Sequence, residues 1–587
     1  MPVTTSLRLA LVAATVAAAL AACGGDGGGN DSGSGSAPPT APVEKPSTRD
    51  EAARFLAQAT FGPVDADIDR LIDIGYAAWV DEQLARTRAQ THRAHWEARD
   101  AEIKVDAPAS GAGQNEVLES FWKQAVTGPD QLRQRMAYAL SQIFVISMVD
   151  GTVGNEPRAV AAYLDMLGEK GLGNYRDLLE AVSRHPMMGA YLSHLRNQKA
   201  NAATGRVPDE NYAREVMQLF SIGLVELNLD GSPKLGTGGA ALETYTPADI
   251  SGLARVFTGW SWDCPAYPVN GCFSNGSSGG VSDPDRWFKP MLGYPAFHST
   301  EAKTFLGTTI AAQTTADPAA SLAAALDRLH NHPNVGPFIG RQLIQRFVTS
   351  NPSPAYVTAV AEAFNDNGSG VRGDLKAVLK AVLMHPEARA QGDTSGKVRE
   401  PVLRLSAYLR AFPHASDTGH WRVGNTDNAG TSLGQTPMRS PSVFNFYRPG
   451  FVPPGTAIAA RGLVAPELQL ASETSAAGYV NYMRDNVSSG VGQSNGAPFN
   501  RRDIRPDFAA ELALATDPAA LVERVTSRLT YGAAGEALKA EIAGAVGAIA
   551  IPAANGSNQT QIDSAKRNRV NAAILLTLAA PEFVVLK

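Results

Sequence analysis

Apolar residues recur at three- and four-residue spacing along most of this chain, and strand-like alternation is scarce. This spacing brings apolar side chains onto one face of an α-helix. The clearest examples are 51–58, 64–84, 121–147, 156–167 and 175–183. The pattern therefore predicts a mainly α fold: a large multi-helix globular body with long loops and at most a few short strands. We expect those strands around 224–229 and Tyr245.

A histidine followed by proline recurs where one predicted helix ends and the next begins, at His185, His332 and His385. Proline suits the first turn of a helix, and it pushes the residue before it out of the helical conformation. The simplest interpretation is that each histidine caps the start of a helix with one ring nitrogen. A catalytic or ligand-binding role is the alternative.

A lipoprotein signal peptide is predicted at residues 1–22. Arg8 precedes an apolar run, 9–22, which is too short and too rich in alanine for a stable membrane span. The run leads into Cys23 through the letters LAAC, which resemble a bacterial lipobox. The resemblance implies cleavage before Cys23 and attachment of lipid to it. The alternative is an ordinary signal peptide with an accidental cysteine.

The expected location is the outer membrane, facing either the periplasm or the cell surface. Gly24 stands where an inner-membrane retention signal usually places aspartate, and a lipidated cysteine holds a protein at a membrane without a spanning helix. Residues 23–46 are rich in Gly, Ser, Asp and Pro, which predicts a flexible tether. The remainder, 47–587, predicts one large α-helical domain, either undivided or with two lobes that meet near the loop 263–300.

Composition supports a large folded core and argues against one class of partner. Hydrophobic residues make up 44% of the chain, charged residues only 19%, and the net charge is -5. A nucleic-acid partner would require a concentrated basic face, and nothing in the sequence suggests one.

Two cysteines remain after the proposed anchor, and they lie close together. Cys264 and Cys272 occur in a loop rich in Pro, Gly and Asn, in a chain that we expect to be exported. A disulfide is the natural interpretation. A metal site is less favoured because no histidine lies beside them at ligand spacing. We expect no metal and no cofactor.

The stretch 209–262 combines two predicted helices with an unusual number of polar residues. In the first helix, polar residues at three- and four-residue steps form a stripe along one face: Asn211, Arg214, Gln218 and Ser221. Apolar residues flank this stripe on both sides. We expect this stripe to be buried, with its charges paired, Glu210 with Arg214 for instance. The alternatives are an ion-pair network between helices and a functional site.

Several segments of the chain resemble one large bacterial family, catalogued as domain of unknown function 1800. They are 211–215 (NYARE), 257–260 (FTGW), 298–307, 338–354, 372–389, 396–401 (GKVREP), 440–446 (SPSVFNF) and 580–583. In 298–307 the family's usual acidic and glycine positions are Ser, Thr and Ala. The resemblance implies an exported, mostly helical protein without an established activity. Such proteins are often encoded beside an exported protein that resembles sulfatases and alkaline phosphatases.

Titratable residues in and beside these segments are the candidate site. The catalytic candidates are Glu215, His298 and Glu400, and the ligand-binding candidates are Asn211, Arg214, Arg255, Lys303, Arg399 and Arg439. A loop histidine near a cation can act as acid, base or anion contact, and arginine binds carboxylate, sulfate and phosphate through its planar fork. If the cations converge, they would form an anion-recognising cavity. The alternatives are a surface His298 and a Glu400 that only favours a helix start.

Common catalytic signatures are absent from the sequence. Two hypotheses follow. In the first, the chain is a cell-envelope lipoprotein that binds or assembles with an exported sulfatase-like protein or an envelope polymer. In the second, it is an enzyme acting on anionic glycans or related envelope polymers, with Glu215 or His298 as acid or base. An enzyme should show its candidates around one open pocket, and a scaffold should show them as closed internal pairs.

Overall fold

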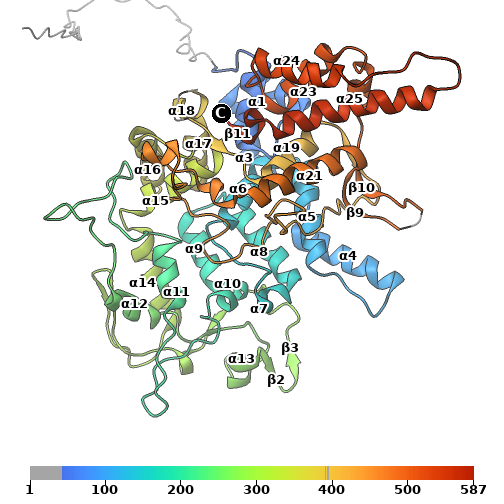
Figure 1. Ribbon diagram of the computed structural model, residues 1–587. Helices are drawn as coiled ribbons and strands as arrows, with labels where there is room; N and C mark the ends of the chain where they lie inside the picture. Colours follow the sequence, from blue (N-terminus) through green and yellow to red (C-terminus); the bar gives the residue numbers. More distant parts are fainter. Residues whose placement is uncertain (1–42, 391, 393–394, 497) are drawn as a thin grey trace, which may run out of the picture. The chain divides into compact units, whose positions relative to one another are not determined.

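Helices dominate the computed structural model, which confirms the mainly α class (Figure 1). The predicted signal peptide, the proposed lipid attachment at Cys23 and most of the tether 23–46 lie outside the described residues. The structure describes residues 43–390, 392, 395–496 and 498–587.

The described part of the chain contains 26 α-helices and two 3-10 helices. Those up to residue 300 are α1 Arg49–Ala59, α2 Asp65–Ile74, α3 Tyr76–Ala85, α4 His92–Asp106, α5 Gln114–Thr127, α6 Gln131–Ser141, α7 Gly151–Gly154, α8 Pro157–Lys170, α9 Tyr175–Arg184, α10 Pro186–Tyr191, α11 Asn211–Gln218, α12 Pro247–Ala254, α13 Asn270–Asn275 and η1 Pro295–Phe297. Those after it are α14 Pro318–His330, α15 Val335–Phe347, α16 Pro354–Asn365, α17 Leu375–Met384, α18 Pro386–Arg389, α19 Pro401–Ala411, α20 Ala457–Ala460, η2 Pro466–Leu470, α21 Glu473–Ser489, α22 Ala509–Ala513, α23 Pro518–Thr530, α24 Glu536–Gly547, α25 Gln559–Ala579 and α26 Pro581–Val584.

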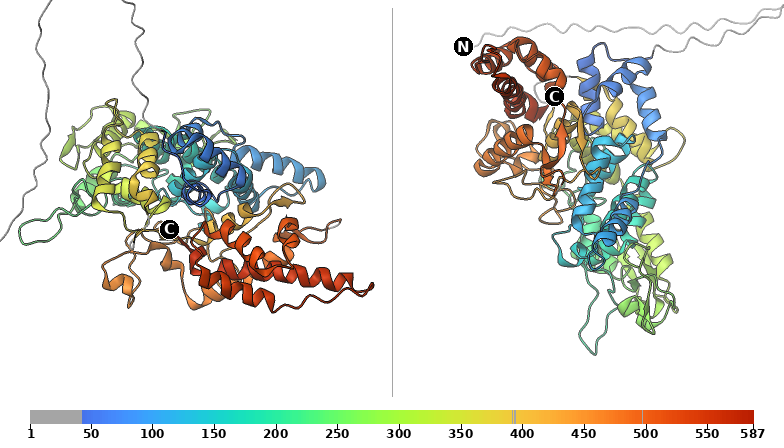
Figure 2. Two further views of the ribbon diagram at one scale, coloured as in Figure 1. Left: turned by 90° about the horizontal axis from the view of Figure 1, so that it is seen from above. Right: turned by 90° about the vertical axis from the view of Figure 1, so that its right-hand side faces the viewer.

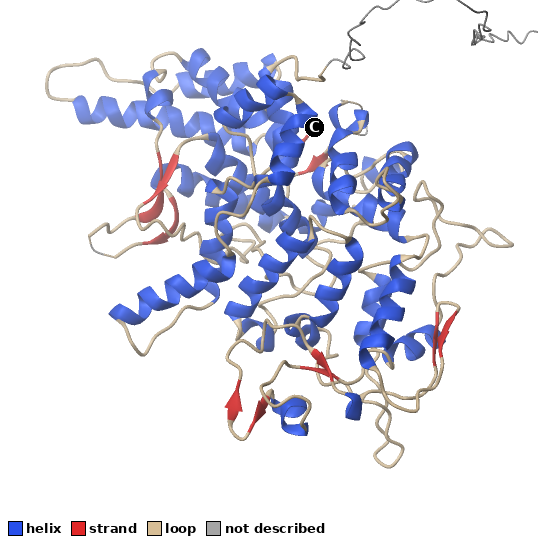
Figure 3. Ribbon diagram, turned by 180° about the vertical axis from the view of Figure 1, so that it is seen from behind, coloured by secondary structure: helices blue, strands red, loops and turns tan. Residues whose placement is uncertain are grey.

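The strands are short and pair only in small antiparallel sheets (Figure 3). They are β1 Trp260–Ser261, β2 Ser277–Ser278, β3 Val281–Ser282, β4 Leu292–Gly293, β5 Lys303–Phe305, β6 Thr308–Ile310, β7 Lys397–Val398, β8 His414–Ser416, β9 Val491–Ser494, β10 Arg502–Pro506 and β11 Val585–Leu586. The pairs are β1–β4, β2–β3, β5–β6 and β7–β11, and the one sheet of three has the order β8-β10-β9. The strands expected around 224–229 and Tyr245 are only isolated bridges, Val225 with Glu243 and Leu227 with Pro233.

Local capping signals set many helix starts. The Nδ1 atoms of His185 and His385 each accept a hydrogen bond from the backbone N–H two residues ahead, at 3.2 Å, and so cap α10 and α18. His332 accepts from the Asn334 N–H in the same way, just before α15 begins. The prediction that these histidines cap helices is therefore confirmed for His185 and His385, whereas the N-cap of α15 is Asn334 and not His332. Thr246 and Asp249 form a reciprocal capping box at the start of α12.

Two helices predicted as continuous are divided. The stretch 64–84 breaks at Gly75, which has a φ of 84° and separates α2 from α3; glycine adopts this conformation without steric cost. The stretch 121–147 breaks after Thr127, where Gly128 and Pro129 separate α5 from α6. Proline has no N–H to continue the helical ladder, so the apolar periodicity resumes in a new helix.

Residues Glu44–Lys587 form one compact unit around a continuous apolar core with members from α1 to β11. In both views of Figure 2, α21–α25 lie together on one side of the helices from the first half of the chain. The first helix contacts the C-terminal part of the chain: Arg54 Nη1 in α1 donates to the Tyr531 carbonyl, at the end of α23, at 2.9 Å. The last strand, β11, pairs with β7, which directly precedes the helix start at Pro401.

No helix of the described ranges has both the length and the apolar character needed to cross a membrane.

Candidate functional site

The nine predicted catalytic and ligand-binding residues do not surround one cavity. They divide among the exposed start of α11, the segment around His298, and the buried start of α19, while Arg439 lies apart from these. These places differ in burial and in hydrogen-bond partners.

The polar stripe of α11 faces solvent at its start and is buried at its end, where Ser221 lies in the interior, so the prediction of a buried stripe is wrong for Asn211 and Arg214. Asn211 and Arg214 are exposed, and Arg214 forms the expected pair with Glu210 at 3.7 Å on the surface. The reason is that α11 is only two turns long and turns its apolar side, including Tyr212 and Val216, fully into the core. A pair this exposed contributes little to stability.

Glu215 is the one charged residue of α11 that is buried. Burial raises the pKa of its carboxyl above the usual range, with Arg214 opposing that shift. Its Oε2 atom has no hydrogen-bond partner among the described residues. Arg214 and Asn211 point to solvent, so Glu215 does not share a pocket with them.

His298 is fully buried and uses both of its ring nitrogens. Nδ1 lies 2.7 Å from the Thr258 carbonyl oxygen, and Nε2 lies 3.1 Å from the Ser321 hydroxyl. Because a carbonyl only accepts, Nδ1 carries the proton and Nε2 accepts from Ser321. Burial lowers the pKa of His298 to about 4. Gly259 permits this packing, since a Cβ there would lie 2.8 Å from the His298 backbone nitrogen.

Two of the predicted cations do lie beside His298. Lys303 is fully buried, and its nearest acceptors are the Glu301 carbonyl and the Gln313 side chain, both at 3.4 Å. Burial, and then the nearby charge of Arg255, lower the pKa of Lys303. Arg255 pairs with the Glu301 carboxylate at 3.1 Å. His298 and Lys303 are therefore engaged in the interior, while the Arg255–Glu301 pair lies at the surface.

Glu400 is a buried acceptor rather than a residue of a helix start that faces solvent. Its Oε2 atom is within hydrogen-bond distance of four donors, on Tyr138 (3.0 Å), Gln142 (2.6 Å), Gln435 (2.6 Å) and Tyr447 (3.2 Å). These donors come from α6, its C-terminal end and the loops around 435–447. Glu400 thus joins three parts of the chain in the interior.

Further buried charges surround Glu400, and sequence reasoning did not select them. Lys397 pairs with Glu467 at 2.9 Å and donates to the Arg346 carbonyl at the same distance. Arg346 Nη2 donates to the Gln142 carbonyl at 2.9 Å, and Arg135 Nη2 donates to the Arg346 carbonyl at 2.6 Å. Arg346 and Lys397 belong to the family-like segments 338–354 and 396–401. Membership in these segments is the sequence signal that could have selected them.

Arg439, the last predicted ligand residue, is held by a carboxylate. Its Nε donates to Asp427 at 2.8 Å, and its Nη1 donates to the Gln114 side chain. Both partners are protein groups, so the guanidinium is already engaged.

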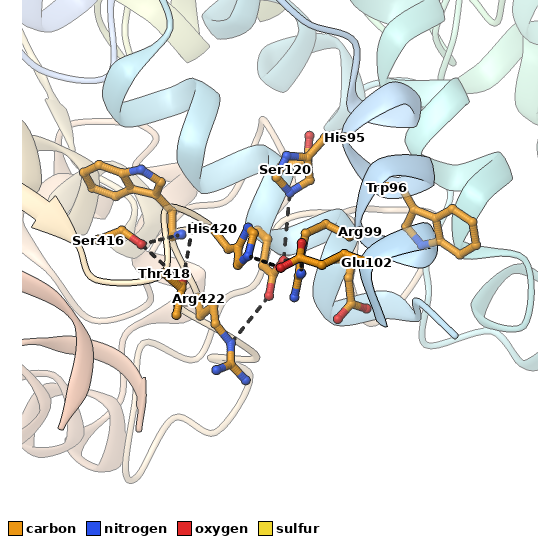
Figure 4. Close-up of polar contacts among 12 residues, drawn as sticks. His95, Trp96, Arg99, Glu102, Ser120, Ser416, Thr418, His420 and Arg422 are labelled. Atoms are coloured by element: carbon orange, nitrogen blue, oxygen red, sulfur yellow. Dashed lines mark hydrogen bonds and ion pairs between the residues drawn. The ribbon is translucent and has the colours of Figure 1, made fainter. Parts of the chain in front are cut away.

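A cluster that the sequence did not predict joins α4, α5 and the loop after β8 (Figure 4). Its centre is the buried carboxylate of Glu119. Around it lie Arg99 Nε at 2.8 Å, Arg422 Nε at 3.6 Å and His95 Nε2 at 3.9 Å. We call these four residues, with Glu102 and His420, the Glu119 cluster.

The outer edge of the Glu119 cluster reaches solvent. His420 Nε2 lies 3.3 Å from Glu102, whose side chain is half exposed, and the two residues are 318 positions apart. Burial, and then the charge of Arg99, lower the pKa of His420. No local motif links positions so far apart, which is why sequence reasoning missed them.

Asp503 holds the loop that carries His420 and Arg422. This fully buried carboxylate accepts hydrogen bonds from the Ser416 hydroxyl at 2.7 Å and from the backbone N–H groups of Thr418 and Arg422, both at 3.0 Å. The Glu119 cluster therefore rests on a rigid support from β10.

The expected disulfide between Cys264 and Cys272 is present, with their Cα atoms 5.5 Å apart. It packs with Phe273 and Tyr294 in a small apolar cluster of its own. In the part of the chain that is described, no group of three or more His, Cys, Asp or Glu side chains is arranged to hold a metal ion.

The fold and these closed clusters define a large, mainly helical protein with a disulfide-linked loop and a charged interior. The chain belongs to the family described as Protein of unknown function (DUF1800), whose model matches residues 54–585. Among curated proteins and among solved structures, no significant match to this chain is found.

Proposed function

We propose that this chain is an outer-membrane lipoprotein of the bacterial envelope whose helical body binds an exported sulfatase-like partner. The LAAC sequence before Gly24 and the tether rich in Gly, Ser and Pro support the anchor. The Cys264–Cys272 disulfide is consistent with an exported protein.

The closure of two of the three predicted catalytic side chains, His298 and Glu400, is the observation that carries a binding function. His298 uses both ring nitrogens on protein groups, and Glu400 accepts from four internal donors. A general acid or base must reach a substrate proton, directly or through one water. Side chains arranged in this way stabilise a scaffold instead.

An exposed apolar arm at 224–244 is the surface we assign to the partner. Backbone hydrogen bonds fold it: the Glu226 N–H donates to the Leu242 carbonyl at 2.7 Å, and the Lys234 N–H donates to the Glu226 carbonyl at 2.7 Å. Four leucines on it are more than a third exposed, namely Leu224, Leu229, Leu235 and Leu242. Exposed apolar groups gathered on one segment favour contact with another protein.

Capture of the partner from detergent-solubilised envelopes tests this proposal. The full chain should recover an exported sulfatase-like protein, and the double variant Leu235→Ser/Leu242→Ser should lose it. Leu576→Ser is the matched control, because Leu576 is a similarly exposed leucine on α25. Equal recovery by the arm variant, or recovery of a polysaccharide in place of a protein, would refute binding of a protein through the arm.

The anchor has a separate test. Cys23→Ser should abolish incorporation of labelled palmitate and should shift the protein from the outer-membrane fraction to the soluble fraction. Unchanged fractionation of Cys23→Ser would contradict the lipid anchor without bearing on the arm.

An enzyme acting on anionic envelope glycans is the second candidate, and the Glu119 cluster is the observation that favours it. Glu119 and His95 are acid–base groups, and Arg99 and Arg422 are cations that suit sulfate or carboxylate. Sulfated and uronic-acid polymers should then be cleaved by the native chain and not by Glu119→Gln or His420→Ala. Absence of cleavage by the native chain across such polymers counts against this candidate.

A further inference from the structure

A small cavity between α1, α6, α19 and the end of α23 has a strongly cationic lining. Arg135, Lys397 and Arg399 line it together with Tyr531, Thr60 and otherwise apolar residues, and no acidic residue does. It has about 10 Å³ of space for the centre of a water-sized sphere. That is room for a single small occupant.

The guanidinium groups of this cavity have donors without protein partners. Arg135 is 1% exposed and Arg399 is 4% exposed. The Nε and Nη1 atoms of both residues, and the Tyr531 hydroxyl, find no hydrogen-bond partner among the described residues. Leaving buried donors unsatisfied is costly, and more so for charged groups, so these atoms together indicate a ligand that accepts hydrogen bonds.

Aromatic rings fix the orientation of both guanidinium groups. Arg399 lies over the ring of Phe583 at 4.8 Å and over the ring of Tyr531 at 5.0 Å. Arg135 lies over the ring of Phe347 at 4.8 Å. Stacking of this kind attracts the cation to the face of the ring and leaves the N–H edges of the guanidinium free to donate.

The charges in this part of the core do not balance. Four cations are buried here, namely Arg135, Arg346, Lys397 and Arg399, against the two buried carboxylates Glu400 and Glu467. The difference, four minus two, is an excess of two positive charges. Lys397 already has Glu467 as its partner. Buried charges require compensation, and the excess falls on the two arginines that line the cavity.

We propose that this cavity is a binding site for one monatomic anion of the chloride class, held between Arg135 and Arg399. The cavity has room for one monatomic occupant and is too small for sulfate or phosphate. A halide accepts several N–H and O–H hydrogen bonds and supplies one negative charge, which halves the excess of two, whereas a water molecule would supply only the acceptors. The bound anion links α6, the β7–α19 junction and Tyr531 at the end of α23.

Bromide identifies the occupant directly. Crystals of the full chain grown in sodium bromide should show anomalous difference density in the cavity, within hydrogen-bonding distance of the Arg135 and Arg399 guanidinium groups. Density without an anomalous signal would mean a water molecule and would overturn the proposal.

Thermal unfolding supplies the second measurement. At constant ionic strength, replacing gluconate by chloride should raise the unfolding midpoint by about 1 °C for each tenfold rise in chloride above its dissociation constant, for a body of this length. Tyr531→Phe should weaken this dependence, and Arg399→Met should remove it. Arg484→Met, which removes an exposed cation, should leave it unchanged. Equal midpoints in chloride and gluconate for the native chain would refute the site even if Arg399→Met fails to fold.

Discussion

The ammonium group of Lys397 lies 2.9 Å from the carboxylate of Glu467, and each side chain is only 2% exposed. Burial lowers the pKa of Lys397 and raises the pKa of Glu467, while their mutual attraction opposes both shifts. The pair connects β7 with η2, so it joins two parts of the chain in the interior.

Removing one partner of this pair should be strongly destabilising. Lys397→Met leaves Glu467 buried without its cation, and such a loss costs about 3–5 kcal/mol. The free energy of unfolding in urea measures it. The double variant Lys397→Met/Glu467→Met should recover much of the loss, because no uncompensated charge remains.

An exposed ion pair provides the control for that experiment. Lys380 pairs with Asp81 at 2.8 Å on the surface, and Lys380→Met should cost no more than about 1 kcal/mol. If the Lys397 and Lys380 variants lose the same free energy, burial is not what makes the interior pair important.

Acid should destabilise the protein through His298. Burial lowers the pKa of His298 to about 4, below the value of about 6.5 in an unfolded chain. Its contribution to stability is therefore fully present above pH 6.5 and is lost as the pH falls towards 4, by about 3 kcal/mol at most. His298→Gln should be less stable at pH 7 and should show a shallower loss between pH 6.5 and 4.

The other buried histidines do not confound this comparison. Burial also lowers the pKa values of His194, His330, His332 and His414 to about 4, and these residues titrate in both chains. The difference between the two unfolding curves isolates His298. If the free energies of unfolding of the native chain and of His298→Gln change with pH in parallel, the prediction that His298 is buried and neutral is contradicted.

Glu215 should affect stability in the opposite direction to His298, by destabilising the protein as the pH rises. Burial raises the pKa of Glu215, so its contribution to stability is present below the unfolded pKa, about 4.3, and is lost as the pH rises through the folded value. The free energy of unfolding of the native chain in urea, relative to that of Glu215→Gln, should therefore fall as the pH rises above about 4.3.

Glu210→Gln is the control for this measurement, because Glu210 is on the same element but exposed. Its free energy of unfolding should differ from that of the native chain by no more than about 1 kcal/mol, because an exposed ion pair contributes little. A Glu215→Gln variant that loses stability steadily as the pH rises would show that the carboxylate has a cationic partner.

Loss of the disulfide should weaken the loop 263–300. The cysteines are eight positions apart, and closing a loop of this length contributes about 2–3 kcal/mol in the chain-entropy description. Cys264→Ser/Cys272→Ser should therefore make this loop the first site of limited proteolysis. In the native chain, alkylation and intact mass should show that neither cysteine is free before reduction, and two free thiols at that stage would contradict the bond.

Local signals in the sequence predict much of the secondary structure. Apolar periodicity predicts the helical class, the His-Pro pairs predict the caps at His185 and His385, and the Thr246 capping box predicts the start of α12. These features depend on neighbouring residues only. The division at Gly75 was missed because one glycine interrupts an otherwise regular apolar pattern.

The candidate site shows the limit of such reasoning. His298 was expected near Lys303, and the structure places Arg255 beside them, but His298 is engaged by protein groups and Arg255 pairs with Glu301 at the surface. Arg135 meets Arg399 only because α6 and the β7–α19 junction border one cavity. Similarly, His420 meets Glu102 across 318 positions. No spacing rule relates residues this far apart.

The sequence by itself determined the helical class, the helix caps and the family-like segments, because each follows from a short run of residues. Only the tertiary structure decided which charges are buried, which are paired and which face solvent. Burial depends on how distant helices pack, and it changes the energetic role of a charged group. Arg214 on the surface contributes little, whereas Arg135 and Arg399 in the interior require a counter-charge.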